Sequence, residues 1–514
     1  MIRKTVLQGA LGKALQRTVI KRLRQVNYDL LEEPFRLRNE TDNAWRCEFW
    51  GKIVRSSVSA AFFTGDTELK AKVERTVQAI IATQTPDGCI SSYPAERQLG
   101  GWDIWGRKYV LLALLRYYEM LNQNPLLLQC CCRMVDHLMT QVGSAAGQTD
   151  ILRCGMHNGL AASSILGAIV SLWRITGCAR YREFVDYLIE RGCSSDGNIF
   201  LSAHSGVTPA AIGNGKAYEM TSCFQGLAEL EILEPDLERH RTVRRYYDAV
   251  STREIFITGT GGLKDISGEF WYDGALRQTR GDCGGLGETC ITVTWLHYCF
   301  RIWQLTEDPK VMDEIENSLY NGLLGALAPD GSHWVHTNPT PLTGGWKPCA
   351  GDQIFRCFKT TFDDNDCCRA QGPEGLAFAS ELAVIESENS LTVNFFEPLV
   401  FGNFVIEGNY PYEPKAVFRF TLTEQRTLRV RIPIFMQKVS LNSTELAFSL
   451  GKYLEIERNW TPEDELILEF DFSLQEIHAP DGSPFVAVKR GPLVLAADSR
   501  GVVPEAAVQV EWRG

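Results

Sequence analysis

Apolar residues recur with a helical period through the first two-thirds of the chain, and this pattern predicts a series of helical hairpins. The helical segments are joined by short turns at Gly65, Asn122 and Gly177. The predicted pairs are 58–64 with 67–83, 110–121 with 126–140, 165–176 with 179–191, and 290–305 with 311–323. Each hairpin has one apolar face that it cannot bury alone, so the hairpins must pack side by side.

The spacing of these turns indicates a coarse internal repeat of about 55 to 58 residues. Closing about six such hairpins into a ring gives an (α/α)6 toroid, whereas an open solenoid is the alternative. Three long segments, 88–107, 192–215 and 258–287, are predicted to be loops at one rim. Long loops gathered at one rim usually form a functional site.

After about residue 380 the apolar pattern changes to a period of two. Alternating segments occur at 391–396, 416–422, 427–432, 453–456, 466–470 and 485–488. Short strands at close spacing, separated by polar turns, predict a β-sandwich. The predicted class is therefore an α+β multidomain protein, with an (α/α)6 toroid or barrel in residues 1–385 and a β-sandwich in residues 386–514.

Composition narrows the class of protein. The formal net charge of −11 disfavours nucleic acid and anionic membrane surfaces as partners. The 16 cysteines are scattered through apolar patterns, which predicts buried reduced thiols and not a disulfide scaffold. The absence of a long apolar run predicts a cytoplasmic protein with neither a signal peptide nor a membrane span. A homodimer is compatible with the sequence, which does not determine the oligomeric state.

One group of residues suggests metal chemistry. Cys367 and Cys368 form an adjacent pair, and Glu288 and Cys290 precede them by about eighty residues. Three thiolates and one carboxylate suit a tetrahedral zinc ion. These residues alone favour structural thiols over a metal site, because adjacent cysteines also arise by chance in a cysteine-rich chain and the CxxC spacing of zinc ribbons is missing. If all four residues bind one ion, we expect irregular backbone at the cysteine pair, and Glu288 and Cys290 at the start of a helix.

The order of several motifs resembles that of a known family. The motifs are Thr258-Gly259-Thr260-Gly261-Gly262, Gly268-Glu269-Phe270, Glu288-Thr289-Cys290, Glu316-Asn317-Ser318-Leu319-Tyr320-Asn321-Gly322, Asp330-Gly331, Asn338-Pro339 and Cys367-Cys368. In this order they resemble the catalytic region of glycoside hydrolase family 127, the zinc-dependent β-L-arabinofuranosidases. The resemblance covers most of the chain and is strongest from about residue 250 onward.

The resemblance implies a retaining exo-glycosidase that acts on a small oligosaccharide or glycoside. The terminal sugar would be an L-arabinofuranoside or a related furanoside or pentoside. By the same resemblance Cys367 is the nucleophile and Glu269 the general acid/base. The implied cofactor is Zn²⁺, held by Glu288, Cys290, Cys367 and Cys368.

The residues expected to contact the sugar depart from the family pattern. Glu316 matches a family glutamate near the nucleophile, and it is read either as a substrate contact or as a carboxylate on a helix surface. His336 stands where members commonly have a tyrosine, and His157 lies in the helical half, where the family uses histidines to hold the sugar. Familiar Gly-His stretches are replaced by Gly106-Arg107-Lys108-Tyr109 and Gly215-Lys216-Ala217-Tyr218. We therefore expect retained catalytic residues and altered sugar specificity.

Two other functions fit the same predicted fold. One is a sugar epimerase or isomerase on an (α/α)6 toroid, which would need paired histidines and no metal. The other is a non-catalytic carbohydrate-binding protein in which zinc is structural. The sequence does not determine the sugar, the linkage or whether the zinc is catalytic.

Overall fold

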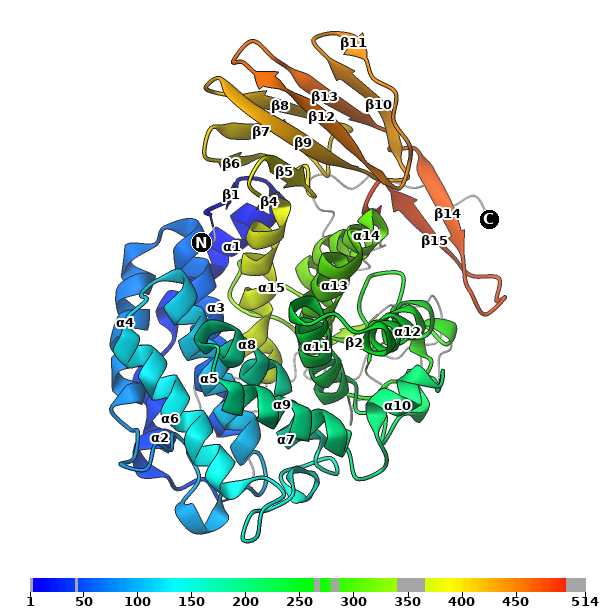
Figure 1. The fold of residues 1–514 in the computed structure, drawn as a ribbon. Coiled ribbons are helices and arrows are strands. Elements are labelled where there is room, and N and C mark those ends of the chain that lie inside the picture. Colours follow the sequence, from blue (N-terminus) through cyan, green and yellow to red (C-terminus); the bar gives the residue numbers. More distant parts are fainter. Residues whose placement is uncertain (1–2, 42–44, 263–268, 279–285, 340–365, 496–514) are drawn as a thin grey trace. The chain divides into compact units, whose positions relative to one another are not determined.

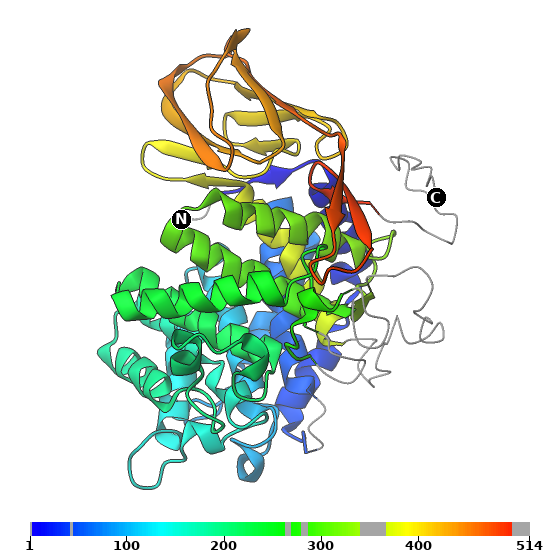
Figure 2. The ribbon, with the colours of Figure 1, turned by 90° about the vertical axis from the view of Figure 1, so that its right-hand side faces the viewer.

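The computed structural model describes residues 3–41, 45–262, 269–278, 286–339 and 366–495. The chain forms two compact units, Met1–Lys4 with Ala14–Glu381 and Thr5–Lys13 with Leu382–Gly514. The first unit is helical and the second is built from β-sheets (Figure 1 and Figure 2), which confirms the predicted fold class. The division falls after Glu381 and not at residue 385, and the segment Thr5–Lys13 belongs with the C-terminal unit.

Six of the described helices form an inner ring (Figure 1). They are α3 (Arg46–Thr64), α5 (Asp103–Met120), α8 (Leu166–Thr176), α11 (Ala217–Leu233), α13 (Thr289–Thr306) and α15 (Cys367–Ala383). Most residues of α3, α5, α11 and α13 are buried, as expected for helices that are packed on all sides. Glu374 of α15 closes the ring, because its carboxylate lies 2.9 Å from Arg55 of α3 and 2.8 Å from His297 of α13.

An outer layer of helices pairs with the ring. It comprises α4 (Thr67–Ile81), α6 (Pro125–Gln141), α9 (Ala179–Arg191), α12 (Leu237–Arg253) and α14 (Pro309–Asn317). Each follows an inner helix after a short turn. Gly65 and Gly177 end α3 and α8 at φ values of 74° and 65°, a backbone conformation that glycine adopts without strain. The predicted hairpins are therefore present, and α11 with α12 adds one that the sequence pattern had not indicated.

Shorter elements complete the helical unit. They are α2 (Tyr28–Leu37), α7 (Leu160–Ser163), α10 (Ile199–His204), the π-helical turn η6 (Ser318–Leu323), and the 3-10 turns η1 (Leu23–Gln25), η2 (Ala95–Arg97), η3 (Ile151–Arg153), η4 (Pro209–Ala211) and η5 (Gly274–Leu276). None of the helices in the described part of the chain is both long enough and apolar enough to cross a bilayer.

The C-terminal unit contains a seven-stranded and a four-stranded sheet. In spatial order, the larger sheet holds β1 (Val6–Leu7), β6 (Leu399–Phe401), β7 (Phe404–Gly408), β8 (Lys415–Phe420), β13 (Leu466–Phe470), β10 (Met436–Leu441) and β11 (Thr444–Glu445). The smaller sheet holds β12 (Lys452–Trp460), β9 (Glu424–Ile432), β5 (Ser390–Val393) and β4 (Val384–Glu386). Phe420 and Trp460 stack between the two sheets at a centroid distance of 5.2 Å, as in a sandwich. A separate three-stranded sheet holds β14 (Leu474–His478), β15 (Val486–Arg490) and β16 (Leu493–Val494).

The segment Thr5–Lys13 joins this unit through backbone pairing and one buried carboxylate. Leu7 of β1 pairs with Leu399 of β6. The first residues of α1 (Ala10–Lys21) follow, where the N–H groups of Leu11 and Gly12 donate to Glu397 at 3.0 and 3.1 Å. A carboxylate satisfies the free N–H groups at a helix N-terminus, and this explains the buried position of Glu397.

Candidate active site

A short β-ladder positions two of the predicted ligands. The strand β2 (Leu286–Glu288) pairs with β3 (Thr337–Pro339), and Glu288 is also the N-cap of α13. One carboxylate oxygen of Glu288 accepts the N–H of Ile291 at 2.9 Å, which fixes the side chain at the helix end. Cys290 is the second residue of α13. The expected place of both residues, at the start of a helix, is confirmed.

The cysteine pair opens α15, so the expectation of irregular backbone at these residues is wrong. Asp366 precedes the helix and accepts the N–H of Arg369 at 2.8 Å, as an N-terminal cap does. The Sγ atoms of Cys367 and Cys368 are 3.9 Å apart. Adjacent helical side chains differ by about 100° in direction. These two nevertheless converge, because no preceding turn of helix covers the first residues.

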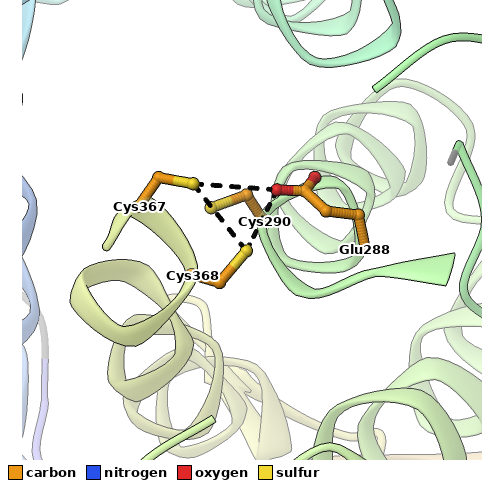
Figure 3. Close-up of side chains that lie close together, drawn as sticks. All are labelled: Glu288, Cys290, Cys367 and Cys368. Carbon is orange, nitrogen blue, oxygen red and sulfur yellow. Dashed lines mark hydrogen bonds between the residues drawn. The ribbon is translucent and has the colours of Figure 1, made fainter. Parts of the chain in front are cut away.

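The four predicted ligands meet at one point (Figure 3). Their donor atoms all lie within 4.8 Å of one another, and Glu288 Oε1 lies 3.0 Å from Cys368 Sγ and 4.0 Å from Cys367 Sγ. Sulfur ligands about 2.3 Å from a tetrahedral zinc ion would be about 3.8 Å apart. The separation of 3.9 Å between the Sγ atoms of Cys367 and Cys368 fits this value. Three soft sulfur donors and one carboxylate are a donor set that suits zinc.

Glu269 and His336 border this cluster. Glu269, Glu288 and His336 have donor atoms within 4.8 Å of one another, so the predicted acid/base carboxylate reaches the cluster. His336 Nδ1 lies 3.4 Å from Cys368 Sγ and 3.9 Å from Cys367 Sγ. Burial opposes a charge on His336, but the contact with Cys367 raises its pKa to about 10. A thiolate at Cys367 therefore favours the charged form of the imidazole side chain.

The three thiols of the cluster differ in exposure and in pKa. Cys290 and Cys368 are 2% and 0% exposed, whereas Cys367 is partly exposed. Burial raises the pKa of Cys290 and of Cys368 well above the usual range. Hydrogen bonds from these two thiols hold the pKa of Cys367 well below it. Of the three thiols, Cys367 is therefore the one whose surroundings most favour the thiolate, which is the nucleophilic form.

A buried lysine on α3 approaches the same cluster. Lys52 Nζ lies 3.8 Å from Cys290 Sγ and 3.5 Å from the carboxylate of Glu48. It also lies 5.0 and 4.8 Å from the ring centres of Tyr109 and Tyr218, which is cation–π distance. Lys52 was not predicted from the sequence, where its only local signal is a charged pair with Glu48 inside a mostly apolar helix.

The loop ahead of α11 supplies another missed residue, Lys216. Its Nζ lies 2.6 Å from Glu269 Oε2 and 3.9 Å from Glu219 Oε1. His157 Nε2 is 4.0 Å from the same oxygen of Glu219, and the His157 ring lies 6.4 Å from that of Phe270. The predicted sugar contact His157 thus contacts Phe270 and Glu219, which are close neighbours of Glu269 and Lys216. Its contact with a sugar stays a prediction.

Glu316 and Gly268 are two further residues of the predicted motifs. Glu316 lies on α14 and is 2% exposed, so the alternative of an exposed carboxylate on the helix surface is wrong. Its contact with substrate stays a prediction. Gly268 of the Gly268-Glu269-Phe270 motif lies outside the described residues.

The chain matches the model of a known catalytic domain. The model of the β-L-arabinofuranosidase GH127 catalytic domain matches residues 6–381. The chain belongs to glycoside hydrolase family 127. This GH127 protein is therefore a glycosidase, and the helical ring that carries the cysteine and glutamate cluster is its catalytic domain.

Individual relatives agree with the assignment. A non-reducing end β-L-arabinofuranosidase of Bifidobacterium longum subsp. longum is 22% identical over 504 residues, which covers 87% of this chain and 74% of the relative. A GH127 β-L-arabinofuranosidase of Geobacillus stearothermophilus T6 has a similar fold, with a TM-score of 0.73 at 19% identity, over 96% of this chain and 86% of that one. A second GH127 β-arabinofuranosidase gives a TM-score of 0.72 at 18% identity, over 95% and 84% of the two chains.

A buried carboxylate behind the Glu269 loop makes the stability of the GH127 protein depend on pH. Glu254 accepts the N–H groups of Tyr272 and Gly274 at 3.0 and 3.1 Å. Burial raises its pKa to about 7. In the unfolded chain the pKa of a glutamate is about 4.3, so the folded protein holds this proton more tightly than the unfolded chain does. The stabilisation from Glu254 is therefore fully present below about pH 4.3 and is lost as the pH rises through about 7. The full loss is about 4 kcal/mol.

We therefore expect the Glu254→Gln variant to gain stability relative to wild type as pH is raised from 5 to 8. Urea unfolding of both proteins across this range measures the difference in their midpoints. Glu190→Gln, at an exposed position on α9, is the control and should follow wild type. Parallel pH curves for wild type and Glu254→Gln would contradict the assignment.

Proposed function

We propose that this GH127 enzyme is a retaining exo-glycosidase that releases a terminal β-L-arabinofuranosyl unit or a related pentosyl unit. The observation that carries the proposal is the partly exposed Cys367, which lies in a cluster of buried thiols within reach of the Glu269 carboxylate. A purely structural zinc site would not need an exposed thiol beside a second carboxylate. The activities in the names of the relatives support the choice of sugar.

The cluster is suited to hold one zinc ion. Glu288, Cys290, Cys367 and Cys368 would be its ligands, on the donor set and separations described above. A bound zinc ion would keep the coordinating thiols deprotonated at neutral pH. Lys52 and His336 place positive charge beside the sulfur atoms and would offset the excess negative charge of three thiolates and one carboxylate.

The proposed reaction has two steps, each with the anomeric carbon at its centre. In the first, the Cys367 sulfur bonds to this carbon while its bond to the leaving oxygen breaks, and Glu269 gives its proton to that oxygen. In the second, Glu269 takes a proton from water, the water oxygen bonds to the carbon, and the carbon–sulfur bond breaks. Two inversions at one carbon retain its configuration.

A direct test is hydrolysis of a panel of 4-nitrophenyl glycosides, together with zinc analysis of the purified protein. The panel should include both furanosides and pyranosides of the pentoses. We expect turnover of at least one pentofuranoside with one zinc per chain. A zinc-loaded protein that cleaves no glycoside in the panel would contradict the proposal.

The position of His336 next to the nucleophile predicts an altered choice of sugar. A site built to hydrogen-bond particular hydroxyl groups rejects sugars that leave its polar groups unpaired. We expect β-L-arabinofuranosides to react more slowly than another furanoside or decorated pentoside. His336→Tyr should change the ratio of the two kcat/KM values by about tenfold and leave the zinc content unchanged.

Two outcomes would contradict this prediction. If a β-L-arabinofuranoside is the best substrate of the wild-type enzyme in a broad panel, the argument for altered specificity is wrong. If His336→Tyr loses zinc, His336 is a ligand, as its grouping with Asp366, Cys367 and Cys368 would allow.

A further inference from the structure

The acid/base candidate Glu269 belongs to a group of three neighbouring charged side chains, with Lys216 and Glu219. Lys216 Nζ contacts Glu269 Oε2 at 2.6 Å and lies 3.9 Å from Glu219 Oε1. Lys216 is 7% exposed and Glu219 1% exposed. Water screens buried charges poorly, so the attraction between Lys216 and Glu219 is stronger than the attraction between two charges on the protein surface.

Backbone pairing holds Lys216 opposite the Glu269 segment. The N–H of Ala217 donates to the carbonyl of Glu269, and the N–H of Trp271 donates to the carbonyl of Gly215, both at 2.9 Å. Lys216 and Phe270 thus form an antiparallel bridge. Residues on paired backbone segments are close neighbours. The backbone pairing therefore holds Lys216 close enough to Glu269 to form their salt bridge.

Glu219 is a second carboxylate next to Lys216. It lies in the first turn of α11, three residues after Lys216. Its Oε2 is buried and makes no hydrogen bond within the described part of the chain. A buried carboxylate is costly unless a cation neutralises it, and Lys216 lies within 4 Å. The ammonium group of Lys216 is therefore held between two carboxylates.

We propose that Lys216, held by Glu219, is a positioning residue that fixes the carboxylate of Glu269 at the cysteine cluster. The inference rests on the proposed acid/base role of Glu269. Lys216 then acts on the reaction only through Glu269, and two consequences follow. Loss of Lys216 should matter most when the leaving group needs a proton, and it should matter little once Glu269 is itself replaced.

The first experiment compares two probes, 4-nitrophenyl and methyl β-L-arabinofuranoside. A nitrophenolate leaves without help from an acid, whereas methoxide needs a proton. We expect Lys216→Met to lower kcat/KM by about 10²-fold for the methyl glycoside and by less than tenfold for the nitrophenyl glycoside. Lys108→Met is the matched control. Lys108 is equally buried, but its Nζ contacts Ser164 at 3.1 Å, so any effect should be the same for both probes.

The second experiment is a double-mutant cycle. Adding Lys216→Met to Glu269→Gln should lower kcat/KM by no more than about twofold beyond Glu269→Gln alone. Lys216→Arg keeps the charge and should recover part of the activity. It also replaces Lys216→Met in the comparison of probes if that variant does not fold. Circular dichroism and zinc content establish that each variant is intact.

The outcomes separate the two proposals. Equal losses on both probes, or full additivity with Glu269→Gln, would mean that Lys216 does not act through Glu269, and would overturn the inference. If Glu269→Gln itself shows no dependence on the leaving group, the acid/base assignment of Glu269 fails and the role of Lys216 fails with it.

Discussion

Replacing Cys367 with alanine is expected to lower kcat/KM by about 10⁴-fold or more while the helical ring stays folded. The reason is that Cys367 is the partly exposed thiol of the cluster, and its neighbours favour the thiolate. Steady-state kinetics on a nitrophenyl furanoside measures the loss. Cys132→Ala is the control, since Cys132 is also a partly exposed cysteine but lies on α6.

The same assignment predicts where a covalent inhibitor will attach. A furanosyl analogue with an electrophilic anomeric carbon should add once to the protein and should be found on Cys367 by peptide mass spectrometry. Attachment to Glu269 or to Glu288 would reverse the assignment of the nucleophile. Retention of more than a tenth of the activity by Cys367→Ala would also contradict it.

Replacing Cys290 with serine is expected to remove most of the zinc. Cys290 is 2% exposed and offers one of three sulfur donors, and a hydroxyl group is a poor substitute for a thiolate. Metal analysis after dialysis against a weak chelator should find about one zinc per chain in wild type and much less in Cys290→Ser. Cys299→Ser is the control, because Cys299 is buried on the same helix but is not part of the cluster.

Zinc loss should also lower thermal stability, because binding to the folded state alone stabilises it. The wild-type protein should therefore unfold at a lower temperature after metal removal, and Cys290→Ser should unfold near that temperature with or without added zinc. Wild-type preparations that never contain zinc would contradict the proposed site. So would a Cys290→Ser variant with a full complement of metal.

The fold followed from the sequence wherever local periodicity determines structure. The period of α5 and the turn at Asn122 were enough to predict the α5–α6 hairpin. The assignment of Thr5–Lys13 to the β unit was not predictable in this way. It depends on two contacts, because Val6 pairs with Val400 and Glu397 accepts the N–H of Leu11. Val400 and Glu397 lie almost 400 residues further along the chain, so the local sequence pattern does not predict either contact.

The site was predictable where a motif carried it and not where packing creates it. Glu288, Cys290 and the cysteine pair were found through their order along the chain. The prediction of irregular backbone at Cys367 was wrong, because the side chains at the first positions of a helix can converge on one ion. Lys216 was noted only as a departure from a Gly-His stretch. Its meaning depends on the backbone bridge to Phe270, which no single segment reveals.

The cysteine cluster joins two helices of the closed ring that are far apart in the sequence. Glu288 and Cys367 are 79 residues apart in the chain and lie at the starts of α13 and α15. An ion bound to both would act as a cross-link across that loop, much as a disulfide does. In the chain-entropy model, closing a loop of this length lowers the conformational entropy of the unfolded chain. The folded state would be stabilised by about 4 to 5 kcal/mol relative to that chain. The helix α15, which bears Cys367, would then be tethered to α13 by the same four side chains that are proposed to hold the zinc ion.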